Sequence, residues 1–165
     1  MFKSAHIIAG LSLASALTCA GSANAQLVTN KDLTLAIALT MAQTAIQTCT
    51  SQGYRVSAHV LGRNGEVLVA MRGDGTGPHT LENSMKKAYT ARMQRRPSGE
   101  FAAAVKDNPT AGALHLANIV PAQGALPIKV GDDTIGAIGI SGAPGGDKDE
   151  ACAKAGIDKV ASDLK

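Results

Sequence analysis

Residues 56–72 read VSAHVLGRNGEVLVAMR, and this stretch decides the fold. The segments Val56–Leu61 and Glu66–Arg72 are rich in β-branched and other apolar residues, which predicts two β-strands. The tetrapeptide Arg63-Asn64-Gly65-Glu66 between them is typical of a tight hairpin turn, because Asn and Gly tolerate positive φ. Strands joined by such a turn pair antiparallel, so the chain is expected to build an antiparallel sheet.

A helix is predicted before this hairpin. Thr29 or Asn30 is a suitable N-cap, and Gly53 is a typical C-terminal stop signal for a helix that runs to about Ser51. Two apolar stripes run along the predicted helix. One contains Leu35 and Leu39, and the other contains residues 33, 37, 41 and 45. Apolar residues on two sides predict a helix that is largely buried.

The hairpin is followed by a loop and a second helix. Residues 73–78 contain three glycines and a proline, which interrupt any regular structure. A helix is expected over Thr80–Arg95, where Glu82 and Lys86 have the spacing of an i,i+4 ion pair. Pro97 ends this helix.

The C-terminal half predicts a mixture of short elements. In chain order we expect a helix over 99–106, a short turn over 110–117, strands over 119–122, 126–130 and 134–141, and a last helix starting at Asp149. The order of helix, two strands, helices, three strands and helix predicts an α/β fold of the α+β type. The middle helices would cover one face of the sheet and the terminal helices the other. No internal repeat or linker divides residues 26–165, so we expect one domain.

The N-terminus resembles a cleavable signal peptide. Lys3 supplies a positive start, Ile7–Leu17 an apolar run of about eleven residues, and Ala23-Asn24-Ala25 a small-x-small cleavage site. Cleavage is expected before Gln26, which makes residues 1–25 the signal peptide and places the protein in the periplasm or outside the cell. Lipid attachment at Cys19 is the alternative. The remaining chain predicts no membrane span.

The composition narrows the classes of partner. The net charge is only +3, which is no nucleic-acid-binding footprint. The chain has two Tyr, two Phe and no Trp, so it lacks the stacking platforms that single-stranded nucleic acids and sugars require. Abundant Ala and Gly favour close packing and suit a homo-oligomer.

Two cysteines remain after the expected cleavage, Cys49 and Cys152. An even pair in an oxidising compartment predicts a disulfide. Two buried free thiols are the alternative. A zinc site is disfavoured because further soft ligands are missing.

Three histidines remain in the same part of the chain, and none has the spacing of a zinc motif. His59 lies within the first strand and His115 within a short apolar turn, so both are expected to be core histidines. His79 follows the Gly/Pro loop and directly precedes a helix that carries Lys86 and Lys87. An imidazole near a helix N-terminus and two ammonium groups suits an anionic, metal-bearing ligand, and an exposed helix-capping histidine is the alternative.

Other chemistry-bearing patterns are weak. Ser141 lies in Gly139-Ile140-Ser141-Gly142-Ala143, which lacks the final glycine of a nucleophile elbow. The segment Gly142–Gly146 precedes a helix and would suit a phosphate, but it lacks the Lys-Ser/Thr ending of a P-loop, so a plain connecting loop is favoured. These residues alone indicate a binding domain without naming its ligand.

Four motifs carry a resemblance that covers about Leu33–Ala161. They are Arg72-Gly73-Asp74-Gly75, Lys87-Ala88-Tyr89-Thr90-Ala91, Gly136-Ala137-Ile138-Gly139-Ile140-Ser141-Gly142, and Asp149-Glu150-Ala151-Cys152-Ala153-Lys154-Ala155-Gly156. In this order and with these gaps, the sequence resembles the GlcG/HbpS-like haem-binding family, also known as the DUF336-type domain. The chain departs from the family pattern in having Gly62 after the first strand, where the family usually has Asp.

The resemblance implies a profilin-like sandwich with an antiparallel sheet of about five strands, assembly into dimers or larger rings, and haem or another tetrapyrrole as ligand. We therefore expect an exported haem-binding protein, such as a scavenger, a carrier or an accessory of a sensor. His79 is the expected iron ligand. The expected cofactor-binding residues around it are Arg72, Asp74, Lys86, Lys87 and Tyr89, with Met71 and Met85 as an apolar face for the macrocycle.

Two other classes of function stay open. One is an enzyme or accessory subunit acting on a small metabolite, with Asp74, Lys87 and Ser141 in an open pocket. The other is a structural pairing module without a ligand. A non-enzymatic role is favoured over a catalytic one.

Overall fold

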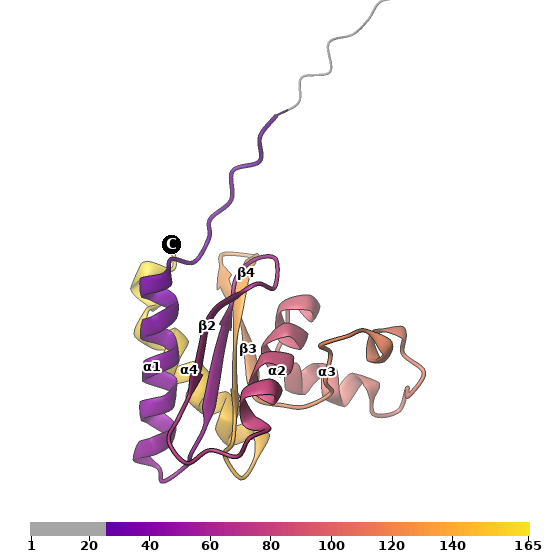
Figure 1. The fold of residues 1–165 in the computed structure, drawn as a ribbon. Helices are drawn as coiled ribbons and strands as arrows, with labels where there is room; N and C mark the ends of the chain where they lie inside the picture. Colours follow the sequence, from indigo (N-terminus) through magenta and orange to yellow (C-terminus); the bar gives the residue numbers. More distant parts are fainter. Residues whose placement is uncertain (1–25) are drawn as a thin grey trace, which may run out of the picture.

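The computed structural model describes residues 26–165 (Figure 1). The expected signal peptide and Cys19 lie outside these described residues. Among the helices of residues 26–165, none combines the length and apolar character needed to cross a bilayer.

The described chain forms a four-stranded antiparallel sheet with helices on both faces. Its elements are, in order, α1 (Leu35–Ser51), β1 (Ser57–Leu61), β2 (Val67–Arg72), α2 (Thr80–Gln94), α3 (Ser98–Val105), the 3-10 turn η1 (Gly112–His115), β3 (Ala125–Val130), β4 (Asp133–Ser141), α4 (Gly146–Lys159) and the 3-10 turn η2 (Ala161–Asp163).

The predicted hairpin is the starting point of the sheet. Gly65 has a φ of 81°, which the turn between β1 and β2 requires and which glycine adopts without strain. The strand order is β2-β1-β4-β3. β1 is therefore central, with His59 opposite Ala70 on β2 and opposite Gly139 on β4. Every residue of β1 is buried, since the strand is covered on both faces.

The helices form two layers around the sheet, as the order of elements predicted. α1 and α4 lie side by side on one face, and α2 covers β1 and β4 on the other (Figure 1). The main core lies between the sheet and the α1–α4 layer, and its largest fully buried side chains include Met41, Val60, Ile128, Ile138 and Ile140. The Cys49–Cys152 disulfide joins α1 to α4 in this layer, which confirms the predicted pairing.

The first helix begins later than the sequence predicted. Its N-cap is Thr34, whose hydroxyl accepts a hydrogen bond from the amide of Ile37 at 3.3 Å. Residues 26–34 have no regular secondary structure, and Leu33 among them packs in the core. The stripe through Leu35 and Leu39 is exposed only at its start, where these side chains are 60% and 37% exposed, whereas Ala42 and Cys49 farther along it are fully buried.

Residues 119–122 are not a strand, which reduces the expected sheet by one strand. The backbone of Val120 pairs with a side chain instead: its N–H donates to the hydroxyl of Thr90 at 2.9 Å, and its C=O accepts from the same hydroxyl at 3.2 Å. Two further corrections are local. α4 begins at Gly146 rather than at Asp149, and His115 is exposed at the end of η1 rather than buried.

Candidate functional site

An open cleft of about 520 Å³ lies at the N-terminal end of α2. One wall is the loop over residues 75–79, and the opposite wall is the Gly-rich segment 142–146 that leads into α4. Lys87, Asn83, Ser141 and Asp149 also line the cleft. The end of β4, the start of α2 and the start of α4 meet at this cleft, because β4 ends between the two helices.

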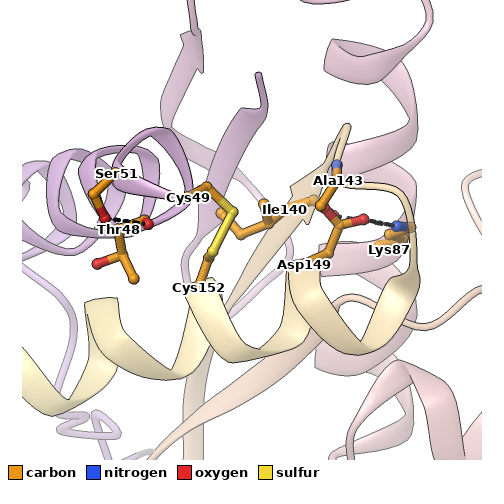
Figure 2. The surroundings of a disulfide bond; sticks show 8 residues. All are labelled: Thr48, Cys49, Ser51, Lys87, Ile140, Ala143, Asp149 and Cys152. Atoms are coloured by element: carbon orange, nitrogen blue, oxygen red, sulfur yellow. Dashed lines mark hydrogen bonds and ion pairs between the residues drawn. A yellow bond between two sulfur atoms is a disulfide. The ribbon is translucent and has the colours of Figure 1, made fainter. Parts of the chain in front are cut away.

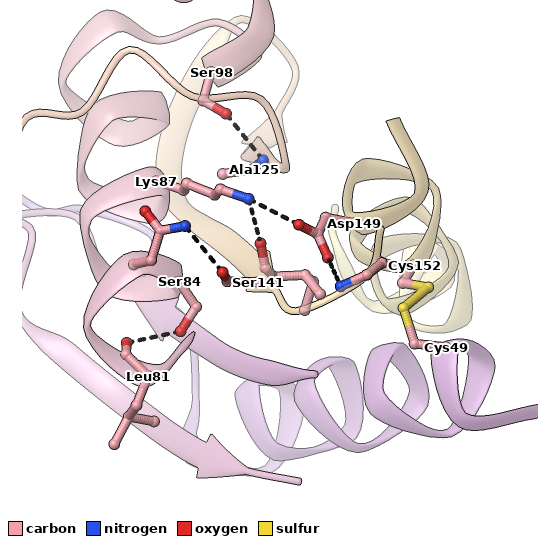
Figure 3. Close-up of polar contacts among 12 residues, drawn as sticks. Cys49, Leu81, Ser84, Lys87, Ser98, Ala125, Ser141, Asp149 and Cys152 are labelled. Carbon is pink, nitrogen blue, oxygen red and sulfur yellow. Dashed lines mark hydrogen bonds and ion pairs between the residues drawn. A yellow bond between two sulfur atoms is a disulfide. The ribbon is translucent and has the colours of Figure 1, made fainter. Parts of the chain in front are cut away.

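A buried ion pair is the electrostatic centre of this cleft. Lys87 Nζ lies 2.8 Å from Asp149 Oδ2, and the two side chains are only 5% and 3% exposed (Figure 3). The ammonium also donates to the carbonyl of Ile140 at 3.2 Å, while Asp149 Oδ1 accepts from the amide of Ala143 at 3.0 Å. Burial raises the pKa of Asp149, and the charge and hydrogen bond of Lys87 oppose that shift. An ammonium has three N–H donors, so one remains for a ligand.

Gly124 makes room for this ion pair. A Cβ atom at this position would lie 2.7 Å from Lys87 Nζ and 2.9 Å from the Cβ of Asp149. Its φ of +132° is also a conformation that other residues rarely adopt. A side chain at position 124 would therefore displace the pair.

The face of α2 that packs on the sheet is polar along the floor of the cleft. Asn83 Nδ2 donates to Ser141 Oγ at 3.0 Å, and the hydroxyls of Ser57 and Thr80 lie 2.8 Å apart. These hydrogen bonds satisfy polar groups that would otherwise be costly to bury. They hold α2 in a fixed register against β1 and β4.

His59 is part of the same polar layer. Its Nδ1 lies 2.8 Å from Ser84 Oγ, and burial lowers the pKa of the imidazole. The neutral ring is therefore a satisfied core histidine, as the sequence predicted.

The mouth of the cleft carries His79 and Arg55. His79 occupies the N-cap position of α2, but its side chain makes no capping hydrogen bond. Both side chains are exposed. The cleft therefore combines an accessible imidazole and an accessible guanidinium at its rim with a buried ammonium–carboxylate pair at its floor.

Residues 33–158 match the family described as "Haem degrading protein HbpS-like". The chain belongs to the HbpS-like family. It is 33% identical over 113 residues to an uncharacterized 15.0 kDa protein from the dhaT-dhaS intergenic region of Citrobacter freundii, a match that covers 67% of this chain and 80% of that protein.

Solved structures show the same HbpS-like fold. The crystal structure of HbpS superposes with a TM-score of 0.77 at 34% identity, covering 81% of this chain and 93% of that one. The crystal structure of the PduOC–haem complex superposes with a TM-score of 0.71 at 21% identity, covering 77% of this chain and 94% of that one. The second comparison supports the fold alone.

The HbpS-like cleft brings together only two of the six expected site residues, His79 and Lys87. Arg72 is bonded to Thr76, whose hydroxyl accepts from Nε at 3.1 Å and whose carbonyl accepts from Nη2 at 3.0 Å. Arg72 lines a separate hollow with Asp74 and Met71, and Tyr89 lines a third hollow. None of these four residues lies in the cleft.

Lys86 also points elsewhere, because it forms the predicted i,i+4 ion pair with Glu82 at 2.6 Å. Met85 does not line the cleft, so the cleft has no methionine face. The walls are instead largely glycine and polar side chains.

Sequence reasoning missed Asp149, Arg55 and Asn83 as cleft residues of this HbpS-like chain. One signal for a buried pair was present. Lys87 shares the buried stripe of α2 with Ser84, Ala88 and Ala91, and a lysine at such a position requires a carboxylate or carbonyl partner. The partner itself is 62 residues away along the chain, and no local pattern identifies it.

Proposed function

We propose that this HbpS-like protein binds haem in the cleft and works outside the cytoplasm as a scavenger, a carrier or an accessory of a sensor. The observation that carries the proposal is the exposed imidazole of His79 at the mouth of a cleft that also offers a guanidinium. The family description supports a link to haem, and PduOC is a relative in fold that was solved as a haem complex.

The cleft residues fit the polar parts of a haem. When bound, haem supplies an iron that takes axial ligands from the protein. His79 would provide that ligand, and Arg55 would pair with a propionate, since guanidinium groups hold carboxylates well. The glycines of both walls let a flat ring approach the backbone closely. Lys87 does not fit the role of main propionate partner, because Asp149 already holds its ammonium.

The cleft is open on one side, so a second subunit would supply further cover for the ring. We therefore include assembly into a homo-oligomer in the proposal. Oligomers of this kind usually have closed symmetry, which would place two clefts in equivalent positions.

Replacing His79 with alanine is expected to weaken haemin binding at least about 10-fold, the lower end of the loss seen when groups that support a metal ligand are removed. The Soret maximum of the remaining complex should also move, because an axial ligand has changed. Titration of the protein with haemin, followed by absorption, measures both effects.

His115→Ala is the matched control, because His115 is also exposed but does not line the cleft. It should bind haemin like the parent. Arg55→Glu should weaken binding more at low salt than at high salt, because exposed charge pairs are screened. Equal affinities and spectra for the parent and His79→Ala would contradict the assignment of His79.

Export is tested separately. The exported protein is expected to begin at Gln26, because Ala23-Asn24-Ala25 matches a signal-peptidase site. The disulfide is consistent with an oxidising compartment. The intact mass of protein recovered from the periplasm or medium measures the cleavage point, and a lipid-modified Cys19 would contradict it.

A further inference from the structure

Three arginines surround the third hollow, the one lined by Tyr89, at the C-terminal end of α2. This hollow has a volume of about 160 Å³, and its lining includes Arg63, Arg92, Arg95 and Tyr89. α2 has 15 residues and is thus about 22 Å long, so the hollow is well separated from the cleft with His79.

Arg63 is already fully engaged. Its Nε donates to Asp32 at 3.0 Å, and its two terminal nitrogens donate to Asp133 at 3.0 and 2.8 Å. Nη2 also donates to the carbonyl of Lys31 at 2.6 Å. Arg63 therefore fixes the β1–β2 turn against β4, its charge is balanced by Asp32 and Asp133, and it offers little further bonding to a ligand.

Arg92, unlike Arg63, has a guanidinium that is incompletely hydrogen-bonded. Its Nε is buried and has no hydrogen-bond partner among residues 26–165. Burial lowers the pKa of the guanidinium, and the positive charges of Arg95 and Arg63 lower it further, while the carboxylates of Asp133 and Glu66 oppose that shift. The partial negative charge at the C-terminus of a helix favours a cation there, but it supplies no acceptor for this nitrogen. A buried donor of this kind is costly unless a partner completes it.

Arg95 follows α2 directly and has a φ of 54°, in the left-handed region. Glycine or asparagine usually occupies this position after a helix, because other residues are strained there. No salt bridge to Arg95 is found in the described part of the chain, 26–165. The left-handed conformation ends α2, and it leaves the guanidinium of Arg95, without an ion pair to residues 26–165, beside the incompletely bonded Arg92.

The aromatic wall of the hollow is held in place by the hairpin. A Cβ atom at Gly65 would lie 2.9 Å from Cε2 of Tyr89, so the glycine of the turn allows the phenol ring to pack directly against the backbone. The phenol thereby becomes part of the lining next to Arg92.

We propose that this hollow binds a small tetrahedral oxyanion of the phosphate type, held by Arg92 and Arg95. Each guanidinium presents a planar fork of N–H donors that matches two oxygens of such an anion. A dianion would also balance the two charges of Arg92 and Arg95, which a monoanion would not. The volume suits a group of this size and excludes a macrocycle.

The test is calorimetric titration of the full-length exported protein with inorganic phosphate, at an ionic strength held constant with sodium chloride. The parent should bind phosphate with a measurable heat, and Arg95→Gly should bind at least about 10-fold more weakly, a loss within the range for hydrogen bonds to charged groups. Glycine removes the strain at this position, so the melting temperature of Arg95→Gly should not fall. Weaker binding then reflects the lost cation rather than a damaged fold.

Arg92→Met should weaken phosphate binding in the same way. Arg96→Met is the matched control, because Arg96 lies over the ring of Phe101 at 5.9 Å and does not line the hollow. A parallel titration with glycerol 1-phosphate shows whether the site takes a free anion or a phosphate ester. Equal phosphate affinity in the parent, Arg95→Gly and Arg92→Met would overturn the proposal, whatever the result with haemin.

Discussion

Replacing Cys49 and Cys152 together with alanine is expected to lower the free energy of unfolding by about 4–5 kcal/mol. The two cysteines are 103 residues apart in sequence, so their bond restricts most of the unfolded chain. In the folded state they connect α1 to α4 within the main core, and both are fully buried (Figure 2). Melting temperature should fall by roughly 8–20 °C for a chain of this size.

Urea unfolding of the oxidised parent and of the double variant measures this effect. Ser51→Ala is a suitable control, because it removes a hydrogen bond to Thr48 on the exposed surface of the same helix and should change stability little. Reduction of the parent should reproduce most of the loss. A double variant as stable as the parent would show that the disulfide does not restrict the unfolded chain.

Replacing Lys87 with methionine is expected to destabilise the protein by about 3–5 kcal/mol at pH 7, because it leaves the carboxylate of Asp149 buried without its cation. Lys87→Met/Asp149→Asn should recover part of the loss, since the amide oxygen can still accept from Ala143 and no buried charge remains. Urea unfolding of the parent, both single variants and the double variant gives the coupling energy of the pair.

The difference in the free energy of unfolding between the parent and Lys87→Met should become smaller as the pH is lowered. Burial already raises the pKa of Asp149 above its unfolded value, and loss of the neighbouring ammonium raises it further. Because the pKa is higher in the folded than in the unfolded state, protonation of Asp149 favours folding. The stability gained from this protonation is fully present below the unfolded pKa, about 4, and is lost as the pH rises through the folded pKa. The variant should therefore be closest to the parent near pH 4 and furthest from it at pH 7.

Lys154→Met is the matched control for this prediction. It breaks the Lys154–Asp158 pair, whose atoms are 2.6 Å apart but whose side chains are 66% and 58% exposed. Exposed pairs of this kind contribute little to stability. A loss of stability in Lys87→Met no larger than that in Lys154→Met would show that the buried pair contributes no more to stability than an exposed one.

Local sequence patterns predicted most of the secondary structure. The Asn64-Gly65 turn, the breaks at Gly53 and Pro97 and the pairing of Glu82 with Lys86 all depend on residues within a few positions of one another. The errors occur where a distant group competes with a local preference. Val120 bonds to Thr90 instead of extending the sheet, and Leu33 packs in the core ahead of a helix whose N-cap is Thr34.

The candidate site was less predictable than the fold. His79 was identified because a Gly/Pro loop and a helix start flank it, and both are local features. Arg72, Asp74, Lys86 and Tyr89 are close to it in sequence, but the structure distributes them over other surfaces. Arg72 ends β2 and Asp74 lies in the loop after it, and along α2 successive residues point about 100° apart, so proximity in sequence does not imply a shared face.

The sequence by itself determined the hairpin, the α+β order of elements, the pairing of the two remaining cysteines and one exposed histidine at a helix start. Only the tertiary structure decided that Lys87 meets Asp149 and that Arg92 has a buried donor without a partner among residues 26–165. The reason is physical. Turns and helix ends depend on the conformational preferences of a few adjacent residues, whereas the environment of a buried charge depends on every element that excludes water from it.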